Sequence, residues 1–370
     1  MKKKWHILQP DEVVIKKLSA SLQCHPITAS ALINRNLTSA ETASNFLTPS
    51  LHQVRSPFDL KDMDAAVHRI YQAITGNEKI LIFGDYDIDG ISATAVLLDF
   101  LRTIGADVTY YIPHRIKEGY SLQRQHIVKH VLPNRIRLVI TADCGIGSHE
   151  AIIAAGNSGI DVIVTDHHEV PEKIPPAAAV LNPKRPDCIS GMETLAGVGV
   201  AFALIIALRK YLRDQNFWNN DRLEPNLKNF CDLVALGTIG DVVPLVGQNR
   251  IFSKVGLDII NSDARPGIKA LCEVAGISQQ PAFAEDVSFR LVPRLNAAGR
   301  MAHASQALQL LTTDNIATAR QLAQSLDELN YRRRELERSI LQGILEDYQQ
   351  QPDLLNNQTL VKWNPTWHQG

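Results

Sequence analysis

The sequence contains nothing that would indicate a disulfide framework or a cysteine-based zinc site. Its cysteines are odd in number, lie far apart and form no Cys-x-x-Cys pair: they are Cys24, Cys144, Cys188, Cys231 and Cys272. This usage is typical of reduced thiols in a cytosolic protein. We therefore expect a cytoplasmic protein without structural disulfides.

Long hydrophobic runs are also missing. The longest, Val200–Leu208, has nine residues, whereas a membrane span needs roughly 18 or more. The apolar stretch Trp5–Leu8 that follows the basic start is too short for a signal peptide. We therefore expect no membrane span, no targeting segment and no membrane partner.

Neither sign of charge dominates the chain. The 38 Lys and Arg residues and 39 Asp and Glu residues leave a net charge of -1, so no overall field attracts nucleic acid or a membrane surface. Any basic site must be local. With 370 residues, of which 45% are hydrophobic and 21% charged, the chain has the composition of a globular protein of about two domains.

A strand–helix rhythm begins near residue 80. Stretches with helical spacing alternate with short apolar runs at Ile80–Phe83, Val108–Ile112, Leu138–Ile140 and Val162–Val164. This alternation predicts an α/β fold whose parallel sheet is covered by helices on both faces. From about Ala196 onward helical patterns dominate. They end in one long charged helix over about residues 317–348, and a further strand is expected at residues 359–362.

Acidic and imidazole side chains follow three of these predicted strands. Asp85–Gly90 follows the first strand, Asp143 follows the third, and Asp166–His168 follows the fourth. The carboxyl ends of parallel strands share one edge of the sheet, where ligands bind. Carboxylate and imidazole groups together suit Mn²⁺ or Mg²⁺.

Each of these motifs has a plainer explanation. The Asp85–Gly90 motif also begins an EF-hand calcium pattern, but position 12 would be Val96 and a strand precedes the motif. Asp143 could belong to a simple turn, and one histidine of the Asp166–His168 motif could be structural. Asp241 is the lone acid in an apolar stretch, so it either needs a partner such as a metal or acts as a turn or cap residue before Pro244.

Two segments are candidates for binding phosphate. Residues 111–140 hold six Lys and Arg residues against one acid, and Arg115 in this stretch lies on the metal side of the predicted sheet. A solvated helix face explains most of these charges equally well. Pro293–Arg300 is expected to be an irregular loop with two arginines. Gly197–Gly199 opens a predicted helix that could admit a phosphate, although close packing explains the glycines better.

The ordered set of motifs resembles the DHH phosphoesterase superfamily and, within it, the RecJ family of single-strand-specific 5′→3′ DNA exonucleases. The resemblance covers essentially the whole chain. It rests on Asp85–Gly90, Asp143, Asp166–His168, Asn182-Pro183, Gly237–Leu245 and Pro293–Arg300.

The resemblance implies a site for two divalent ions, with Mn²⁺ preferred and Mg²⁺ possible. The implied ligands are Asp87, Asp89, Asp143, His167 and Asp241, with Asp143 as the bridge and with Asp85 and His168 as supporting ligands or orienting groups. Asp87, Asp89, Asp143, His167, His168 and Asp241 form the implied catalytic set. The implied substrate contacts are Arg115, Arg294, Asn296 and Arg300.

The implied reaction is hydrolysis of single-stranded DNA from its 5′ end to 5′-mononucleotides, in DNA repair and recombination. Single-strand-binding protein and a helicase are possible partners. The resemblance also divides the chain into an N-terminal segment (1–55), a DHH domain (56–316), a connecting helix (317–350) and the start of a DHHA1-type domain (351–370).

Two other functions remain open. The first is a DHH phosphatase for short oligonucleotides or pyrophosphate-like substrates; in family II pyrophosphatases a histidine stands where this chain has Phe83, which argues against that branch. The second is a non-catalytic DHH scaffold, which would be expected to lack ligands that are all present here.

Overall fold

The molecule is built on a parallel sheet. The computed structural model describes residues 4–277, 280–350, 359 and 361–368. Its sheet has the order β2-β1-β3-β4-β5 and parallel pairing throughout. The strands are β1 (Ile80–Gly84), β2 (Val108–Tyr111), β3 (Leu138–Ala142), β4 (Asp161–Thr165) and β5 (Ala179–Leu181). The first four were predicted, whereas β5 has only three residues and was missed.

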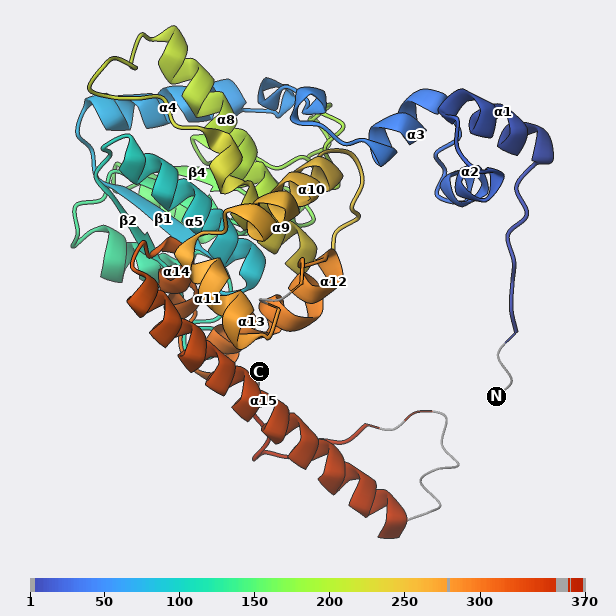
Figure 1. Ribbon diagram of the computed structural model, residues 1–370. Helices are drawn as coiled ribbons and strands as arrows, with labels where there is room; N and C mark the ends of the chain where they lie inside the picture. The colour runs from blue at the N-terminus through green and yellow to red at the C-terminus, as the bar shows by residue number, and fades with distance from the viewer. Residues whose placement is uncertain (1–3, 278–279, 351–358, 360, 369–370) are drawn as a thin grey trace.

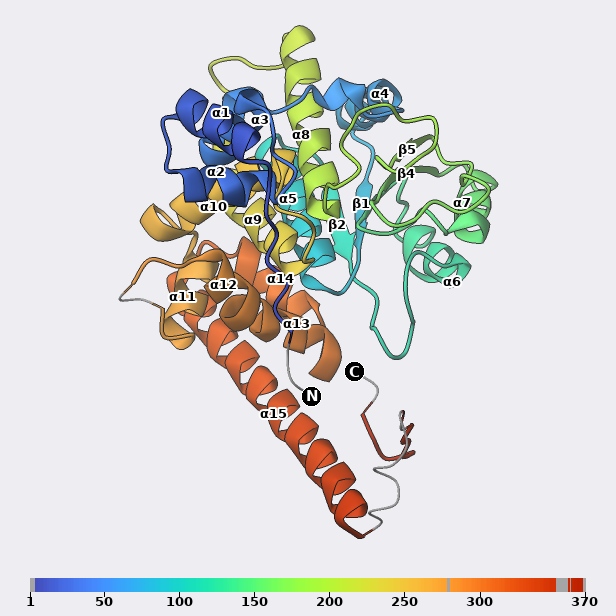
Figure 2. The ribbon, with the colours of Figure 1, turned by 90° about the vertical axis from the view of Figure 1, so that its right-hand side faces the viewer.

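Helices cover both faces of the sheet, which confirms the predicted fold class (Figures 1 and 2). Ile80 and Ile82 of β1 join one hydrophobic core, while Leu81 and Phe83 join the other, as the alternation of side chains along a strand requires. The first core packs beneath α4 (Met63–Thr75), α5 (Ile88–Thr103) and α8 (Gly197–Asp214). The second packs beneath α6 (Arg124–His126), the π-helical η3 (Ile127–Val131) and α7 (His149–Gly156).

A helical region follows the sheet in sequence and packs against α5. It contains α9 (Cys231–Gly240), α10 (Gly247–Ser262), α11 (Pro266–Val274), α12 (Ala284–Asp286), η5 (Val287–Leu291), α13 (Val292–Met301) and α14 (Ser305–Thr312). The expectation of an irregular loop at Pro293–Arg300 is wrong, because this segment is helical. Pro293 stands directly after the π-helical η5, in a helical segment that runs without a break from Ala284 to Met301.

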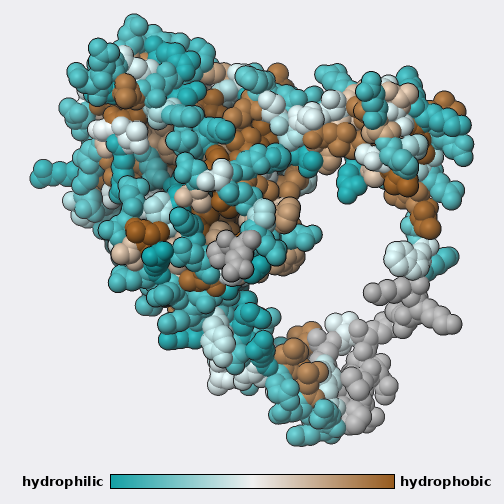
Figure 3. Space-filling view, in the orientation of Figure 1, coloured by the Kyte–Doolittle hydropathy of each residue, from teal (hydrophilic) through white to brown (hydrophobic). Residues whose placement is uncertain are grey.

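The first three helices and the last helix extend from this body (Figure 1). The helices α1 (Glu12–Leu22), α2 (Pro26–Ile33) and α3 (Ala40–Leu47) share a small core of their own. The long α15 (Ile316–Gln350) buries residues only in its first half. Its second half projects with a mostly hydrophilic surface (Figure 3).

The strand expected at residues 359–362 is not observed. Thr359, Val361 and Lys362 have no regular structure, and Leu360 lies outside the described residues. Most of the segment 351–370 lies outside the described residues too. Over the part of the chain that is described, no helix is both long enough and apolar enough to cross a membrane.

A buried ion pair connects the helical region to α5. Arg265 contacts both carboxylate oxygens of Asp232 on α9, at 2.8 and 3.0 Å, and Asp99 on α5 at 3.1 Å. It also donates to the carbonyl of Leu311 at the end of α14. The guanidinium group of Arg265 therefore connects three helices, α5, α9 and α14.

We expect Arg265→Met to lower the free energy of unfolding by about 3–5 kcal/mol, because it leaves Asp232 buried without its cation. Urea denaturation measures the loss. The exposed pair of Arg320 with Glu273 supplies the control, since Arg320→Gln should cost no more than about 1 kcal/mol. If the two single variants lose equal stability, the proposed importance of the buried pair is wrong.

Candidate metal centre

The turn between β1 and α5 carries three aspartates. Asp85 directly follows β1, and Asp87 is the N-cap of α5, accepting from the backbone N–H groups of Asp89 and Gly90 at 3.0 and 3.2 Å. Asp89 is fully buried in the first turn of α5. A strand precedes this motif and a helix begins inside it, so it is not an EF-hand loop.

Strand pairing brings Asp143 beside this turn. Gly84 of β1 is in register with Ala142 of β3, and the backbone N–H of Asp85 donates to the carbonyl of Ala142 at 3.1 Å. The two strands flank the point where the strand order reverses, which is where open α/β sheets bind ligands. Asp143 itself has a φ of 63°, a left-handed conformation that is uncommon for residues other than glycine and that aspartate tolerates better than most.

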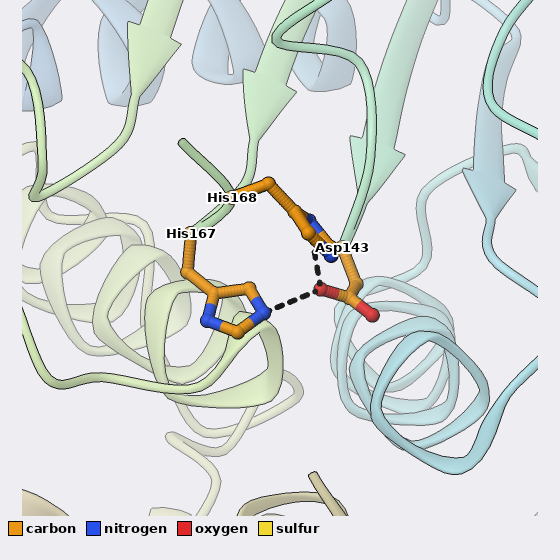
Figure 4. Close-up of side chains that lie close together, drawn as sticks. All are labelled: Asp143, His167 and His168. Atoms are coloured by element: carbon orange, nitrogen blue, oxygen red, sulfur yellow. Dashed lines mark ion pairs between the residues drawn. The ribbon is translucent and has the colours of Figure 1, made fainter. Parts of the chain in front are cut away.

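The end of β4 adds His167 to the same edge. Its Nε2 lies 3.2 Å from Asp143 Oδ1 (Figure 4). The same atom lies 3.6 Å from Asp89 Oδ2. Burial lowers the pKa of His167 overall, although the backbone of Leu195 also acts on the ring and raises that pKa. Neither His167 Nε2 nor Asp143 Oδ1 has a hydrogen-bond partner, although both atoms are buried.

His168 is held differently from its neighbour. Its Nδ1 lies 2.7 Å from Asp166 Oδ1 and 3.9 Å from Asp143 Oδ1. Asp166 also accepts from the backbone N–H of Ile146 at 2.9 Å. We predicted no individual role for Asp166 from the sequence. An acid two residues before a histidine at a strand end was the feature that could have indicated one. Here Asp166 orients His168, as carboxylates commonly do for histidines in metal sites.

Asp241 reaches the site from the C-terminal end of α9. Its Oδ2 lies 3.6 Å from His167 Nε2. A carboxylate at a helix C-terminus faces the negative end of the helix dipole, so a capping role does not explain Asp241. The position supports the alternative, a carboxylate that needs a cation.

The N-terminus of α8 also packs against the site and contacts Asp89. The backbone N–H groups of Gly197 and Val198 donate to the two oxygens of Asp89 at 2.6 and 2.8 Å. A Cβ on Gly197 would lie 2.3 Å from Asp143 Oδ1, so only glycine fits. Close packing therefore explains this glycine, and the helix N-terminus is already used by Asp89 instead of being available to a phosphate.

Burial and neighbouring charges shift the pKa values of the side chains in the site. Burial, followed by the negative charge of Asp87, raises the pKa of Asp85 to about 7. Burial and neighbouring carboxylates raise the pKa of Asp241 to about 6 and hold those of Asp89 and Asp143 well above the ordinary value. Burial and then the charge of His168 lower the pKa of His167 to about 4.

These side chains form overlapping sets of potential metal ligands. Among the described residues, three sets have ligand atoms within 4.8 Å of one another: Asp143 with His167 and His168, Asp89 with His167 and Asp241, and Asp85 with Asp87 and Asp143. Asp143 and His167 each belong to two sets. Every metal ligand expected from the sequence is thus brought to one place, and the unpartnered lone pairs fit a divalent cation.

The four residues expected to contact the substrate lie in different surroundings. The guanidinium of Arg115 lies 4.9 Å from the ring centroid of Tyr86, within the Asp85–Asp87 turn. Arg300 lies close enough to Asp87 for that carboxylate to act on its pKa, which burial lowers overall. Arg294 instead pairs with Asp327 of α15 at 2.8 Å. The Oδ1 of Asn296 is buried without a hydrogen-bond partner.

An open cavity of about 1030 Å³ adjoins the site. Tyr120, Gly145, Asp166 and His168 are part of its wall. The hydroxyl of Tyr120 lies 3.3 Å from His168 Nδ1. Of the candidate metal ligands, His168 lines this cavity, which therefore lies beside the His168 end of the site.

Known proteins are similar to this chain in sequence. Residues 79–238 match the DHH family, N-terminal domain. The chain is 38% identical over 370 residues to a single-stranded-DNA-specific exonuclease RecJ of Bacillus subtilis, covering 100% of this chain and 45% of the relative. It is 42% identical over 317 residues to the RecJ exonuclease of Escherichia coli, covering 84% and 55%.

Solved structures agree with these sequence matches. RecJ from Thermus thermophilus, in complex with Mn²⁺, aligns with a TM-score of 0.77 and 34% identity over 91% of this chain and 46% of that one. An exonuclease RecJ bound to manganese aligns with a TM-score of 0.69 and 38% identity over 78% and 70%. These findings place the chain in the DHH class, as the fold and the carboxylate–histidine edge indicate. Within that class the chain belongs to the RecJ family, and it spans about half the length of the curated relatives it matches.

We expect Gly197→Ala to weaken divalent-metal binding about 10- to 100-fold, because the added Cβ displaces Asp143. Titration with Mn²⁺ in a calorimeter measures the change. Gly199→Ala is the matched control, since its Cβ meets the movable Cδ2 end of Leu195. Equal metal affinity for the two variants would contradict this account of Gly197.

We also expect the metal-free chain to lose thermal stability as the pH rises from 5 to 8. Asp85 and Asp241 have raised pKa values, so the folded chain still binds protons there that the unfolded chain has released above about pH 4. Stability is therefore highest at low pH in this window and falls as the pH passes each folded-state pKa. Melting curves in EDTA test this, and Asp85→Asn should flatten the fall. An unchanged slope would show that Asp85 does not titrate as described.

Proposed function

We propose that the chain carries the catalytic centre of a divalent-metal-dependent nuclease that hydrolyses phosphodiester bonds of single-stranded DNA from the 5′ end, releasing 5′-mononucleotides. The observation that supports this best is that two buried atoms 3.2 Å apart, Asp143 Oδ1 and His167 Nε2, have no hydrogen-bond partner and lie among further carboxylates. RecJ relatives are named as single-stranded-DNA-specific exonucleases, and we extend that activity to this chain as a proposal.

Two cations would be held by the same side chains. We assign Asp89, His167 and Asp241 to one ion and Asp85 and Asp87 to the other, with Asp143 shared between them. When bound, such a pair lowers the pKa of a water molecule and offsets the negative charge of a phosphodiester. Mn²⁺ is our preferred metal because it accepts imidazole as well as carboxylate; RecJ structures have been solved with Mn²⁺ and with Mg²⁺.

The remaining groups would orient the substrate. The hydrogen bond from His168 to Asp166, which outweighs burial, raises the pKa of His168, so its imidazole holds a second proton over a wider range of pH than usual. A protonated His168 can donate to a phosphate oxygen. Arg115 lies over the ring of Tyr86 and Arg300 lies close to Asp87, so both would contact phosphates of the strand near this turn. Arg294 could join them only by leaving Asp327. Asn296 could contact a phosphate oxygen only by donating from its side-chain Nδ2, because its Oδ1 is an acceptor.

The division of the chain into residues 1–55, 56–316, 317–350 and 351–370 also remains a proposal. A role in DNA repair and recombination is also a proposal. The same holds for single-strand-binding protein and a helicase as partners. Limited proteolysis and pull-down experiments address them separately.

We expect Asp143→Asn to reduce hydrolysis at least about a hundredfold, because it removes the charge shared by both ions. The substrates are single- and double-stranded DNA labelled at either end, each with and without Mn²⁺. Asp214→Asn, which changes an exposed acid paired with Lys210, is the control and should be fully active. Retention of activity by Asp143→Asn, or faster release of 3′ than of 5′ label from wild type, would contradict the proposal.

A further inference from the structure

The loop that follows β5 is tied to the histidine pair of the metal centre. Leu181, the last residue of β5, is in register with Thr165 at the end of β4, so both strands deliver their next residues to the same edge of the sheet. The buried Asn182 then joins the two connections. Its Nδ2 donates to the carbonyl of His168 at 2.9 Å, and its Oδ1 accepts from the backbone N–H of Lys184 at 2.8 Å. The backbone of Lys184 is therefore fixed relative to His168.

Two cations follow β5, and the fold uses one of them itself. The guanidinium of Arg185 pairs with Asp62 at 2.5 Å and with the two carboxylate oxygens of Asp187 at 2.9 and 2.7 Å. It also donates to the carbonyl of Val180 within β5. These contacts offset the charge of Arg185 and anchor its side chain. Of the two cations, it is therefore Lys184 that can serve an anion from outside the chain.

The Lys184 ammonium lies beside the metal centre. Its Nζ is 3.0 Å from Oε1 of Glu169, the residue that follows His168. Burial raises the pKa of Asp241 to about 6, and the positive charge of Lys184 acts against that rise. Burial also lowers the pKa of His167 to about 4, and the charge of Lys184 acts in the same direction. A cation that acts on both side chains is close to the part of the site that they form.

Glu169 holds this ammonium only weakly. Its side chain is 88% exposed, whereas that of Lys184 is 30% exposed. An ion pair with so exposed a carboxylate contributes little to stability, so Glu169 can turn into solvent at little cost while the backbone of Lys184 stays bound to Asn182. A phosphate oxygen is an anionic acceptor like the carboxylate oxygen, and lysine binds phosphate as a compact point charge. A phosphate can therefore take the place of Glu169.

The strand order separates Lys184 from the arginines considered above. In the order β2-β1-β3-β4-β5, the connection after β2 carries Arg115 and the connection after β5 carries Lys184. The aspartate turn (Asp85–Asp89), Asp143 and His167 follow the three strands between them. Lys184 therefore lies on the opposite side of the candidate metal ligands from Arg115. A DNA strand that crosses this edge of the sheet meets Lys184 after it has passed the ligands.

We propose that Lys184 binds a phosphate group of the substrate strand on the β5 side of the metal centre, and that Glu169 holds the ammonium until this phosphate replaces it. The inference rests on the proposed function and adds to it a contact that the arginines do not supply. The exchange replaces one ion pair by another, so no covalent bond changes. With Lys184 on one side and Arg115 on the other, the strand is held across the candidate ligands.

The first test compares Lys184→Gln with Lys173→Gln, which makes the same charge change at an exposed lysine on the same connection between β4 and β5. Binding of a fluorescent single-stranded oligonucleotide is measured in EDTA, where no hydrolysis occurs, over a range of salt concentrations. We expect Lys184→Gln to weaken binding about five- to tenfold and to lower the slope of log K against log salt by about 0.7. Lys173→Gln should match wild type, and Lys184→Arg should keep the slope.

The partner of Lys184 supplies a test in the opposite direction. Glu169→Gln should tighten binding of the same oligonucleotide about two- to fivefold, because it frees the ammonium. Glu172→Gln removes an exposed negative charge three residues further along the chain and should leave the affinity unchanged. Tighter binding by both variants to the same extent would show a general effect of charge and would contradict the exchange.

Metal binding distinguishes a substrate contact from damage to the site. Calorimetry with Mn²⁺ should give Lys184→Gln an affinity equal to or above that of wild type, because a positive charge near Asp241 and His167 has been removed. Equal strand binding by Lys184→Gln and Lys173→Gln overturns the inference, and so does a loss of Mn²⁺ affinity in Lys184→Gln that parallels the loss of strand binding. Failure of wild type to bind Mn²⁺ or degrade DNA instead contradicts the proposed function. Melting curves establish that each variant is folded.

Discussion

Two buried atoms that face each other without a hydrogen-bond partner, Asp143 Oδ1 and His167 Nε2, are the constraint on which this structure depends. They lie 3.2 Å apart beside four further carboxylates, whose negative charges repel one another and that of Asp143 unless a cation offsets them. The fold keeps them in place at a cost. Asp143 takes a left-handed backbone conformation, and Gly197 leaves room for the Asp143 carboxylate.

The parallel sheet explains how residues far apart in sequence meet in this way. Neighbouring strands end at the same edge, so the residues after β1, β3 and β4 are neighbours in space. The helices that follow the sheet contribute the remaining contacts of the site. Asp241 comes from the end of α9, the first N–H groups of α8 hold Asp89, and α13 sets Arg300 against the aspartate turn.

Much of this architecture follows from local pattern. Four strands and the candidate ligands were predictable because apolar runs and the polar residues after them are close in sequence. Strand β5 was not, since three residues carry too little periodicity. The helix α13 was mistaken for a loop because Pro293, Asn296 and Gly299 are poor helix formers, and packing against α15 overrides them. The roles of Gly197 and Asp166 depend on distances across the fold, which spacing along the chain does not report.

The central claim is that this edge of the sheet is built to bind a pair of divalent cations that share Asp143. Anomalous diffraction from crystals soaked in Mn²⁺ tests it most directly. The account predicts two peaks, one at bonding distance from His167 Nε2 and both at bonding distance from the Asp143 carboxylate. A single peak, or peaks away from Asp143, would contradict it.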